Sequence, residues 1–220
     1  MDWQIPSLTY EDVRLEANRF AARYWASGSV PVDIEHITEF ELHFDVIPVP
    51  GLKSLLKTDA FLYSDFSAIA VDQWIYTYHG VRHRFSLAHE LGHYFLHRDL
   101  YAKLHIGSIA DYQSCRNALS DADMAYMEDH AYWFAGMILL PLGHLERAVA
   151  DAVKKCRDHG VSLRRMWDTI GERRYICEPI GRQFNVSREV VGRQIELDGL
   201  DHKYGLAAPR KSRWRPGIGR

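Results

Sequence analysis

The sequence has few cysteines, and their spacing excludes two common uses of that residue. There are three, Cys115, Cys156 and Cys177, and no two of them form a C-x-x-C pair. An odd, scattered set argues against a disulfide framework and against a zinc site built on thiolates. The pattern is typical of a reducing compartment, and we expect the three side chains to be small buried residues.

Long apolar runs and an excess of charge of one sign are also absent. No stretch approaches the roughly 20 apolar residues of a membrane-spanning helix, and residues 1–6 lack the basic-then-apolar pattern of a signal peptide. The formal net charge of -2 and the pI near 6.6 do not indicate a nucleic-acid binder. We therefore predict a cytoplasmic protein of ordinary globular composition with no membrane partner.

The chemistry-bearing feature that the sequence does contain is a His-Glu-x-x-His motif. His89 and His93 are four residues apart, so on a helix they project from one face and can bind a single metal ion. Glu90 lies one step around that helix, where it can reach a water on the ion rather than the ion itself. Two imidazoles beside a carboxylate are typical of a catalytic zinc site. The alternative is a core helix whose histidines are only hydrogen-bonded.

The residues around the motif predict a largely buried helix. Apolar side chains recur from Val81 to Leu96, and His83 is expected to lie exposed near the helix start. Gly92 interrupts the helix although glycine disfavours helix formation by about 1 kcal/mol relative to alanine. We infer that another segment of the chain approaches the backbone closely at Gly92.

A small sheet is predicted between the first helix and the motif. Thr9 and Asp12 form a capping pattern that begins a helix ending near Gly28. Turn residues and short apolar runs then predict a helix over 31–40 and strands over 44–49, 60–63 and 67–71, with 74–78 as a continuation of the sheet.

A second apolar helix follows a loop-rich connection predicted over 97–120. Ser120 caps this helix, which runs to Leu140. Glu128 lies on a stripe of small and apolar residues within it. A carboxylate on such a stripe needs a partner because an isolated buried charge is strongly unfavourable, and a zinc ion would provide one.

Two segments together resemble the ImmA/IrrE family of metallo-endopeptidases: Phe85-Ser86-Leu87-Ala88-His89-Glu90-Leu91-Gly92-His93 and Glu128-x-x-Ala131-x-x-Phe134-Ala135-x-x-x-Leu139-Leu140-Pro141. The resemblance implies a gluzincin-like fold with one zinc ion. It also implies that His89, His93 and Glu128 are the ligands and that Glu90 is the general base. Many members carry an acidic or amide residue where this chain has His130, so Asp129 and His130 stay open as alternatives to Glu128.

Other side chains near the motif have weaker claims to a role. His97 lies on the face of the two histidines, and we expect it to pack or to orient a ligand. A metzincin site with Asp99 as third ligand would need a glycine at Leu96, which disfavours it. Tyr94 and Tyr132 can donate to a developing oxyanion, although buried tyrosines more often pack. By analogy with other zincins, residues 67–71 would be the edge strand that seats a substrate.

The chain after Pro141 predicts a helical subdomain with a helix-turn-helix-like region at about 174–198. One interpretation places Arg188, Arg193 and Gln194 near DNA. We favour the other, in which these three residues lie on the solvated face of a helical subdomain packed on the peptidase, because neighbouring glutamates dilute the positive charge there.

Together these patterns predict an α+β fold. A zincin-like metallopeptidase domain at 1–141 would carry a small sheet packed on the motif helix, followed by a helical subdomain at 142–204 and a basic, disordered tail at 205–220. The predicted function is zinc-dependent hydrolysis of peptide bonds, and the resemblance implies that the substrate is a helix-turn-helix transcriptional repressor. The alternatives are a non-proteolytic regulatory protein that binds DNA or a repressor around a structural zinc, and a zinc hydrolase of another substrate.

Overall fold

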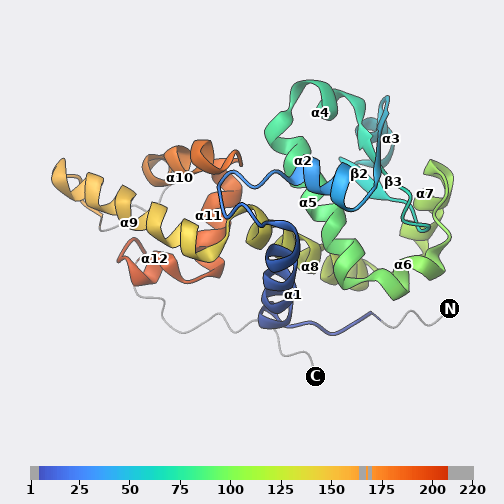
Figure 1. The fold of residues 1–220 in the computed structure, drawn as a ribbon, viewed down its shortest axis with the longest axis horizontal. Coiled ribbons are helices and arrows are strands. Elements are labelled where there is room, and N and C mark those ends of the chain that lie inside the picture. Colours follow the sequence, from blue (N-terminus) through green and yellow to red (C-terminus); the bar gives the residue numbers. More distant parts are fainter. Residues whose placement is uncertain (1–4, 164–166, 168–169, 208–220) are drawn as a thin grey trace.

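The computed structural model describes residues 5–163, 167 and 170–207, in which a mostly helical chain surrounds one three-stranded sheet (Figure 1). The prediction of an α+β fold is therefore confirmed. The elements are α1 (Tyr10–Tyr24), α2 (Ile34–His36), the π-helix η1 (Ile37–Glu41), β1 (Asp45–Val49), α3 (Leu52–Leu56), β2 (Ala60–Leu62), β3 (Ala68–Asp72), α4 (Gln73–Tyr78), α5 (Gly80–Leu96), α6 (Arg98–Leu104), α7 (Ile109–Ala118), α8 (Asp121–Leu139), α9 (Leu142–Asp158), α10 (Ile170–Phe184), α11 (Arg188–Leu197) and α12 (Leu200–Lys203).

The sheet has the strand order β1-β3-β2, which overturns the prediction that residues 67–71 form an edge strand. β3 pairs in parallel with β1 on one side and antiparallel with β2 on the other, and every residue of β3 is buried. The apolar run at 68–71 within it fits a central strand, because both edges and both faces of such a strand are covered. The edge strands of this sheet are β1 and β2.

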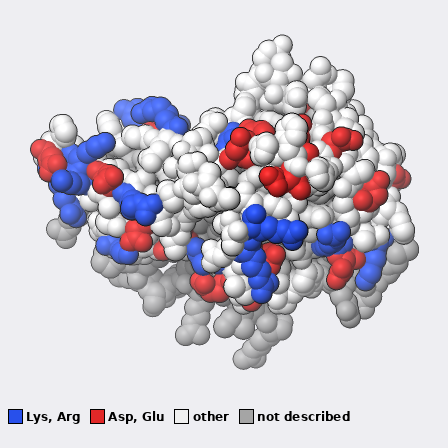
Figure 2. Space-filling model, in the orientation of Figure 1, with Lys and Arg blue, Asp and Glu red and all other residues white. Residues whose placement is uncertain are grey.

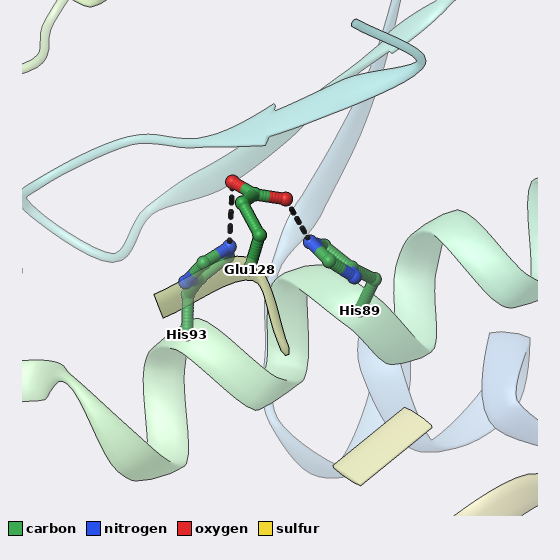
Figure 3. Close-up of side chains that lie close together, drawn as sticks. All are labelled: His89, His93 and Glu128. Atoms are coloured by element: carbon green, nitrogen blue, oxygen red, sulfur yellow. Dashed lines mark hydrogen bonds and ion pairs between the residues drawn. The ribbon is translucent and has the colours of Figure 1, made fainter. Parts of the chain in front are cut away.

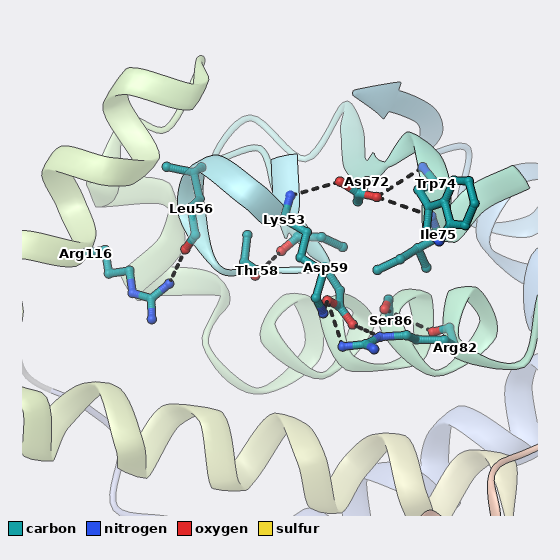
Figure 4. Close-up of polar contacts among 11 residues, drawn as sticks. Lys53, Leu56, Thr58, Asp59, Asp72, Trp74, Ile75, Arg82, Ser86 and Arg116 are labelled. Atoms are coloured by element: carbon teal, nitrogen blue, oxygen red, sulfur yellow. Dashed lines mark hydrogen bonds and ion pairs between the residues drawn. The ribbon is translucent and has the colours of Figure 1, made fainter. Parts of the chain in front are cut away.

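Residues 74–78 do not extend the sheet; they form helix α4. Asp72 ends β3 and caps this helix, since its carboxylate accepts hydrogen bonds from the backbone N–H groups of Trp74 at 3.0 Å and Ile75 at 3.2 Å (Figure 4). An aspartate at that position stabilises a helix start more than the aromatic residues after it favour a strand. The turn also places Tyr76 against His83. His83 is only 8% exposed, so the prediction that it lies exposed is wrong.

The connection predicted as loop-rich over 97–120 is helical as well. It contains α6 and α7, and Ser108 caps α7 by accepting a hydrogen bond from the backbone of Asp111. No residue of α7 is buried, so this helix lacks the apolar periodicity that identifies helices in a sequence. The three cysteines are free, but Cys177 alone is fully buried, while Cys115 and Cys156 are half-buried.

Helices α5 and α8 approach each other closely where they cross at Gly92. A Cβ atom added to Gly92 would lie 2.8 Å from the Cα atom and 3.0 Å from the carbonyl oxygen of Ala131. These distances confirm the inference that another segment lies against the backbone at Gly92. Helix α8 is central in the fold, because it packs against α1 and α11 as well as α5.

The C-terminal helices contact the N-terminal helix through one buried carboxylate. Asp198 accepts hydrogen bonds from the Tyr10 hydroxyl at 2.8 Å and from the Gln194 amide at 3.1 Å, and it pairs with Arg14.

Over α9 and α10, basic and acidic groups are interspersed on the face shown in Figure 2. Most of the predicted tail, residues 208–220, lies outside the described residues. Among the residues described, no helix is both long and apolar enough to span a bilayer.

We expect the substitution Gly92→Ala to lower the free energy of unfolding by about 1–3 kcal/mol, because the added methyl group overlaps the backbone of α8. The matched control is Gly143→Ala in α9, where an added Cβ meets nothing within 4 Å. Thermal and chemical unfolding would show destabilisation of the first variant and an unchanged or raised stability of the second. Equal stabilities would contradict the close approach of α5 and α8.

Candidate metal centre

The structure brings His89, His93 and Glu128 together at the crossing of α5 and α8 (Figure 3). The Nε2 atom of His89 lies 3.0 Å from one carboxylate oxygen of Glu128, and the Nε2 atom of His93 lies 3.7 Å from the other. The three ligand atoms are all within 4.8 Å of one another. The two rings come from successive turns of α5, and the carboxylate reaches across from α8.

This donor set fits a divalent metal ion. Zinc binds imidazole nitrogen and carboxylate oxygen at about 2.0–2.2 Å, so two of its ligand atoms in a tetrahedron are about 3.4 Å apart. The observed separations of 3.0 Å and 3.7 Å lie on either side of that value. His93 is buried, whereas the Glu128 side chain keeps 45% of its surface exposed, so the cluster is open on one side. Three protein ligands with an open side are typical of a catalytic rather than a structural zinc site.

The charge state of the cluster also favours a cation. Burial acts to raise the pKa of Glu128, but the facing rings of His89 and His93 outweigh it and hold that pKa well below its usual range. Burial acts to lower the pKa of His89, and the hydrogen bond to Glu128 reverses this and raises it. The pocket thus keeps a carboxylate ionised opposite positive charge, which a metal ion can supply in place of a proton.

Glu90 lies on the same helix as the two histidines and is buried, with 5% of its surface exposed. Burial raises its pKa, while His93 and His89 oppose the shift and the backbone of Leu62 in β2 also stabilises the carboxylate. A carboxylate with a raised pKa accepts a proton more readily near neutral pH. Its surroundings therefore suit a general base, the role that the sequence predicts.

Glu90 and the three clustered residues share a cavity of about 310 Å³. One wall is a polar network in which Asp59 pairs with Lys53 at 2.5 Å and with Arg82, while Thr58 donates to the Ala60 carbonyl at 2.9 Å (Figure 4). Its cations lower the pKa of Asp59 although burial acts to raise it. The sequence did not indicate this wall, because it joins α3 and the start of β2 to α5.

Tyrosines form another part of the cavity wall. Tyr101 from α6, Tyr112 from α7 and Tyr132 from α8 line it, and Tyr101 packs on His93 with ring centroids 5.1 Å apart. Sequence reasoning missed the first two because α6 and α7 were expected to be loops. Tyr94 lies elsewhere, in an aromatic cluster with Phe44. Of the two tyrosines considered as oxyanion donors, Tyr132 is therefore the one beside the cluster.

The other candidate ligands lie apart from this cluster in the described structure. Asp129 points toward Arg193, with a contact of 3.3 Å, and Asp99 is exposed on α6. His130 is fully buried, and both of its ring nitrogens have other partners: His97 at 3.2 Å and the carbonyl of Leu8 at 3.1 Å. His97 in turn contacts His93, at 3.1 Å.

The residues proposed for DNA contact on α11 are mostly engaged by the protein. Gln194 is 1% exposed and donates to the Tyr10 hydroxyl at 3.0 Å, so its placement near DNA is wrong. Arg193 lies over the ring of Tyr132 at 4.2 Å from the centroid. The interpretation of DNA contact, which we did not favour, and the solvated face, which we did, both missed the burial of Gln194, because α11 packs on α8 and contacts Tyr10 of α1, which no local pattern reveals. Arg188 is exposed and pairs with its neighbour Glu189.

Comparison with known proteins gives one family and one similar structure. The model of the peptidase family M78, described as the IrrE N-terminal-like domain, matches residues 79–196, more than half of the chain. A solved structure of a Mycobacterium tuberculosis transcriptional regulator is 20% identical with a TM-score of 0.49, over 83% of this chain and 46% of that one. The chain thus spans less than half of that protein. No curated protein matches.

We expect Glu128→Ala to weaken zinc binding by more than about 100-fold, since loss of a ligand should exceed the effect of losing an outer hydrogen-bond partner. Asp129→Ala is the matched control, because its side chain faces Arg193 rather than the cluster. Competition with a chromophoric chelator measures both affinities. Unchanged affinity in Glu128→Ala with a loss in Asp129→Ala would place the third ligand at Asp129 instead.

Proposed function

The chain belongs to the family of IrrE N-terminal-like domains of peptidase class M78, and from that premise we propose that it is a zinc-dependent endopeptidase. The observation that carries the proposal is the cluster of His89, His93 and Glu128 in one cavity with the buried carboxylate of Glu90. A structural zinc site would be closed by a fourth protein ligand, and this cluster is open toward the cavity.

In this proposal His89, His93 and Glu128 hold the metal. Zinc bound there would polarise the carbonyl of the scissile peptide bond and lower the pKa of a water molecule to about 7. Glu90 takes a proton from the attacking water as the water oxygen bonds to the carbonyl carbon. Glu90 then passes that proton to the amide nitrogen as the carbon–nitrogen bond breaks. Tyr132 lines the same cavity, and in this proposal its hydroxyl donates to the developing oxyanion.

The start of β2, where Thr58, Asp59 and Ala60 line the cavity, is the proposed seat for the substrate backbone, in place of the strand at 67–71 predicted from the sequence. Tyr63 donates to the Ala68 carbonyl at 3.0 Å, and Asp72 donates to the Asp59 carbonyl at 2.8 Å. In an antiparallel pair these bonds alternate, so Leu62 directs its N–H and C=O groups away from β3. Leu62 is fully buried and its backbone already stabilises the Glu90 carboxylate. Ala60 has the same orientation and lines the cavity, so a peptide added as an extended strand would pair there.

The identity of the substrate rests on the family resemblance. It suggests a regulatory protease that cleaves a helix-turn-helix transcriptional repressor. We keep the division into a zincin-like domain at 1–141 and a helical subdomain at 142–204, with helix-turn-helix-like α10 and α11, as part of this proposal. A non-proteolytic protein that binds DNA or a repressor is the alternative, and direct DNA contact through α11 is disfavoured by the burial of Gln194.

Glu90→Gln tests the proposal because it removes the base and leaves the three ligands in place. We expect zinc-loaded wild type to cleave members of a synthetic peptide library, read by mass spectrometry, and the variant to lose activity by a factor of about 10² or more. The variant should keep its zinc content and its melting temperature. Asp129→Asn, whose carboxylate faces Arg193 and does not line the cavity, is the control for a lost carboxylate that takes no part in proton transfer.

Two outcomes would contradict the proposal that this protein is an enzyme. Cleavage that survives in Glu90→Gln would show that another group, or a contaminant, performs the reaction. Specific DNA binding that persists after zinc chelation, with no cleavage of any library peptide by wild type, would favour the non-proteolytic alternative.

A further inference from the structure

A chain of hydrogen bonds leads from the ligand His93 into the protein. The Nδ1 atom of His93 lies 3.1 Å from Nδ1 of His97, and the Nε2 atom of His97 lies 3.2 Å from Nδ1 of His130. The Nε2 atom of His130 lies 3.1 Å from the carbonyl oxygen of Leu8. His97 and His130 are 1% and 0% exposed, so water does not reach the rings to compete for these bonds.

The end of this chain sets the direction of every bond in it. A backbone carbonyl can only accept, so Nε2 of His130 must carry a proton. In a neutral imidazole the other nitrogen is then an acceptor, so His130 accepts from Nε2–H of His97. By the same rule His97 uses its Nδ1 atom to accept from Nδ1–H of His93. A second proton on His97 or His130 would put a charge into the buried interior, which is unfavourable.

We infer that His97 and His130 are positioning residues that hold His93 in the tautomer with its proton on Nδ1. In that tautomer Nε2, the atom that faces Glu128, carries a lone pair and is ready to bind a metal ion. Metal-binding histidines usually obtain this orientation from a carboxylate or a carbonyl that contacts their second nitrogen directly. In the described part of this chain two further histidines lie between the ligand and the carbonyl.

The carbonyl at the end of the chain is itself held in place. Leu8 precedes Thr9, whose capping box begins α1, and α1 packs against α8. The hydroxyl of Tyr126 donates to the same carbonyl oxygen at 3.3 Å, and its ring packs on His130 with centroids 4.2 Å apart. The segment before α1 thus helps to determine which ring nitrogen of His93 carries the proton, although His93 lies on α5, more than 80 residues later in the sequence.

The inference rests on the proposed metal site, because it concerns the readiness of His93 to bind zinc. His97→Phe leaves Nδ1–H of His93 without an acceptor, and we expect zinc affinity to fall by roughly 10–100-fold. His97→Asn places an amide oxygen near the position of the lost Nδ1 atom and should restore affinity to within a few fold. His83→Phe replaces another buried histidine of α5 that lies outside the chain of bonds, and should bind zinc as wild type does.

Nuclear magnetic resonance tests the tautomers directly, in wild type and without activity. Long-range ¹H–¹⁵N spectra recorded above the ordinary histidine pKa should show His97 and His130 protonated on Nε2 alone, in both the zinc-free and the zinc-loaded protein. The zinc-loaded protein should also show His93 protonated on Nδ1.

The inference about the chain of hydrogen bonds and the proposal of the metal site can be contradicted separately. A proton on Nδ1 of His97 or His130, or full zinc affinity in a folded His97→Phe variant, would overturn the inference that His97 and His130 hold the tautomer of His93. Absence of zinc binding by wild type, with the expected tautomers at His97 and His130, would overturn the metal site while the hydrogen-bonded chain stands. If His97→Phe does not fold, the spectra of wild type and the affinity of His97→Asn still decide the question.

Discussion

The contact between Gly92 and Ala131 is the constraint on which the rest of the site depends. Glycine has no side chain, so α5 and α8 approach until backbone atoms are in contact. Ala131 follows Glu128 by three residues, which puts both on one face of α8. His89 precedes Gly92 by three residues. The close crossing therefore delivers a carboxylate from one helix to the imidazoles of the other without a flexible loop.

The surroundings of the cluster determine which chemistry it can perform. Burial raises the pKa of Glu90, and the backbone of Leu62 in β2 stabilises its carboxylate. The polar network of Asp59 with Lys53 and Arg82 ties the start of β2 to α5. In the proposed mechanism, Glu90 and the start of β2 are thus fixed relative to His89, His93 and Glu128, which is the arrangement that peptide hydrolysis requires.

Features with a local cause could be predicted from the sequence. The motif spacing, the cap at Ser120 and the anomalous Gly92 each act within one helix or at one contact, and the structure has α5, α8 and their close crossing. The position of β3 in the sheet could not be predicted, because strand order depends on pairing between distant segments. The burial of Gln194 against Tyr10 and the bonds linking His93 to Leu8 have the same character. Helix α7 escaped prediction because it has no fully buried residue and therefore no clear apolar periodicity.

The central claim is that His89, His93 and Glu128 bind one zinc ion. Anomalous diffraction at the zinc edge, from crystals grown with one equivalent of zinc, tests it most directly. The account predicts a single peak at about 2.0–2.2 Å from Nε2 of both histidines and from a carboxylate oxygen of Glu128. A peak ligated by Asp129 or His130, or no peak within reach of His89 and His93, would contradict it.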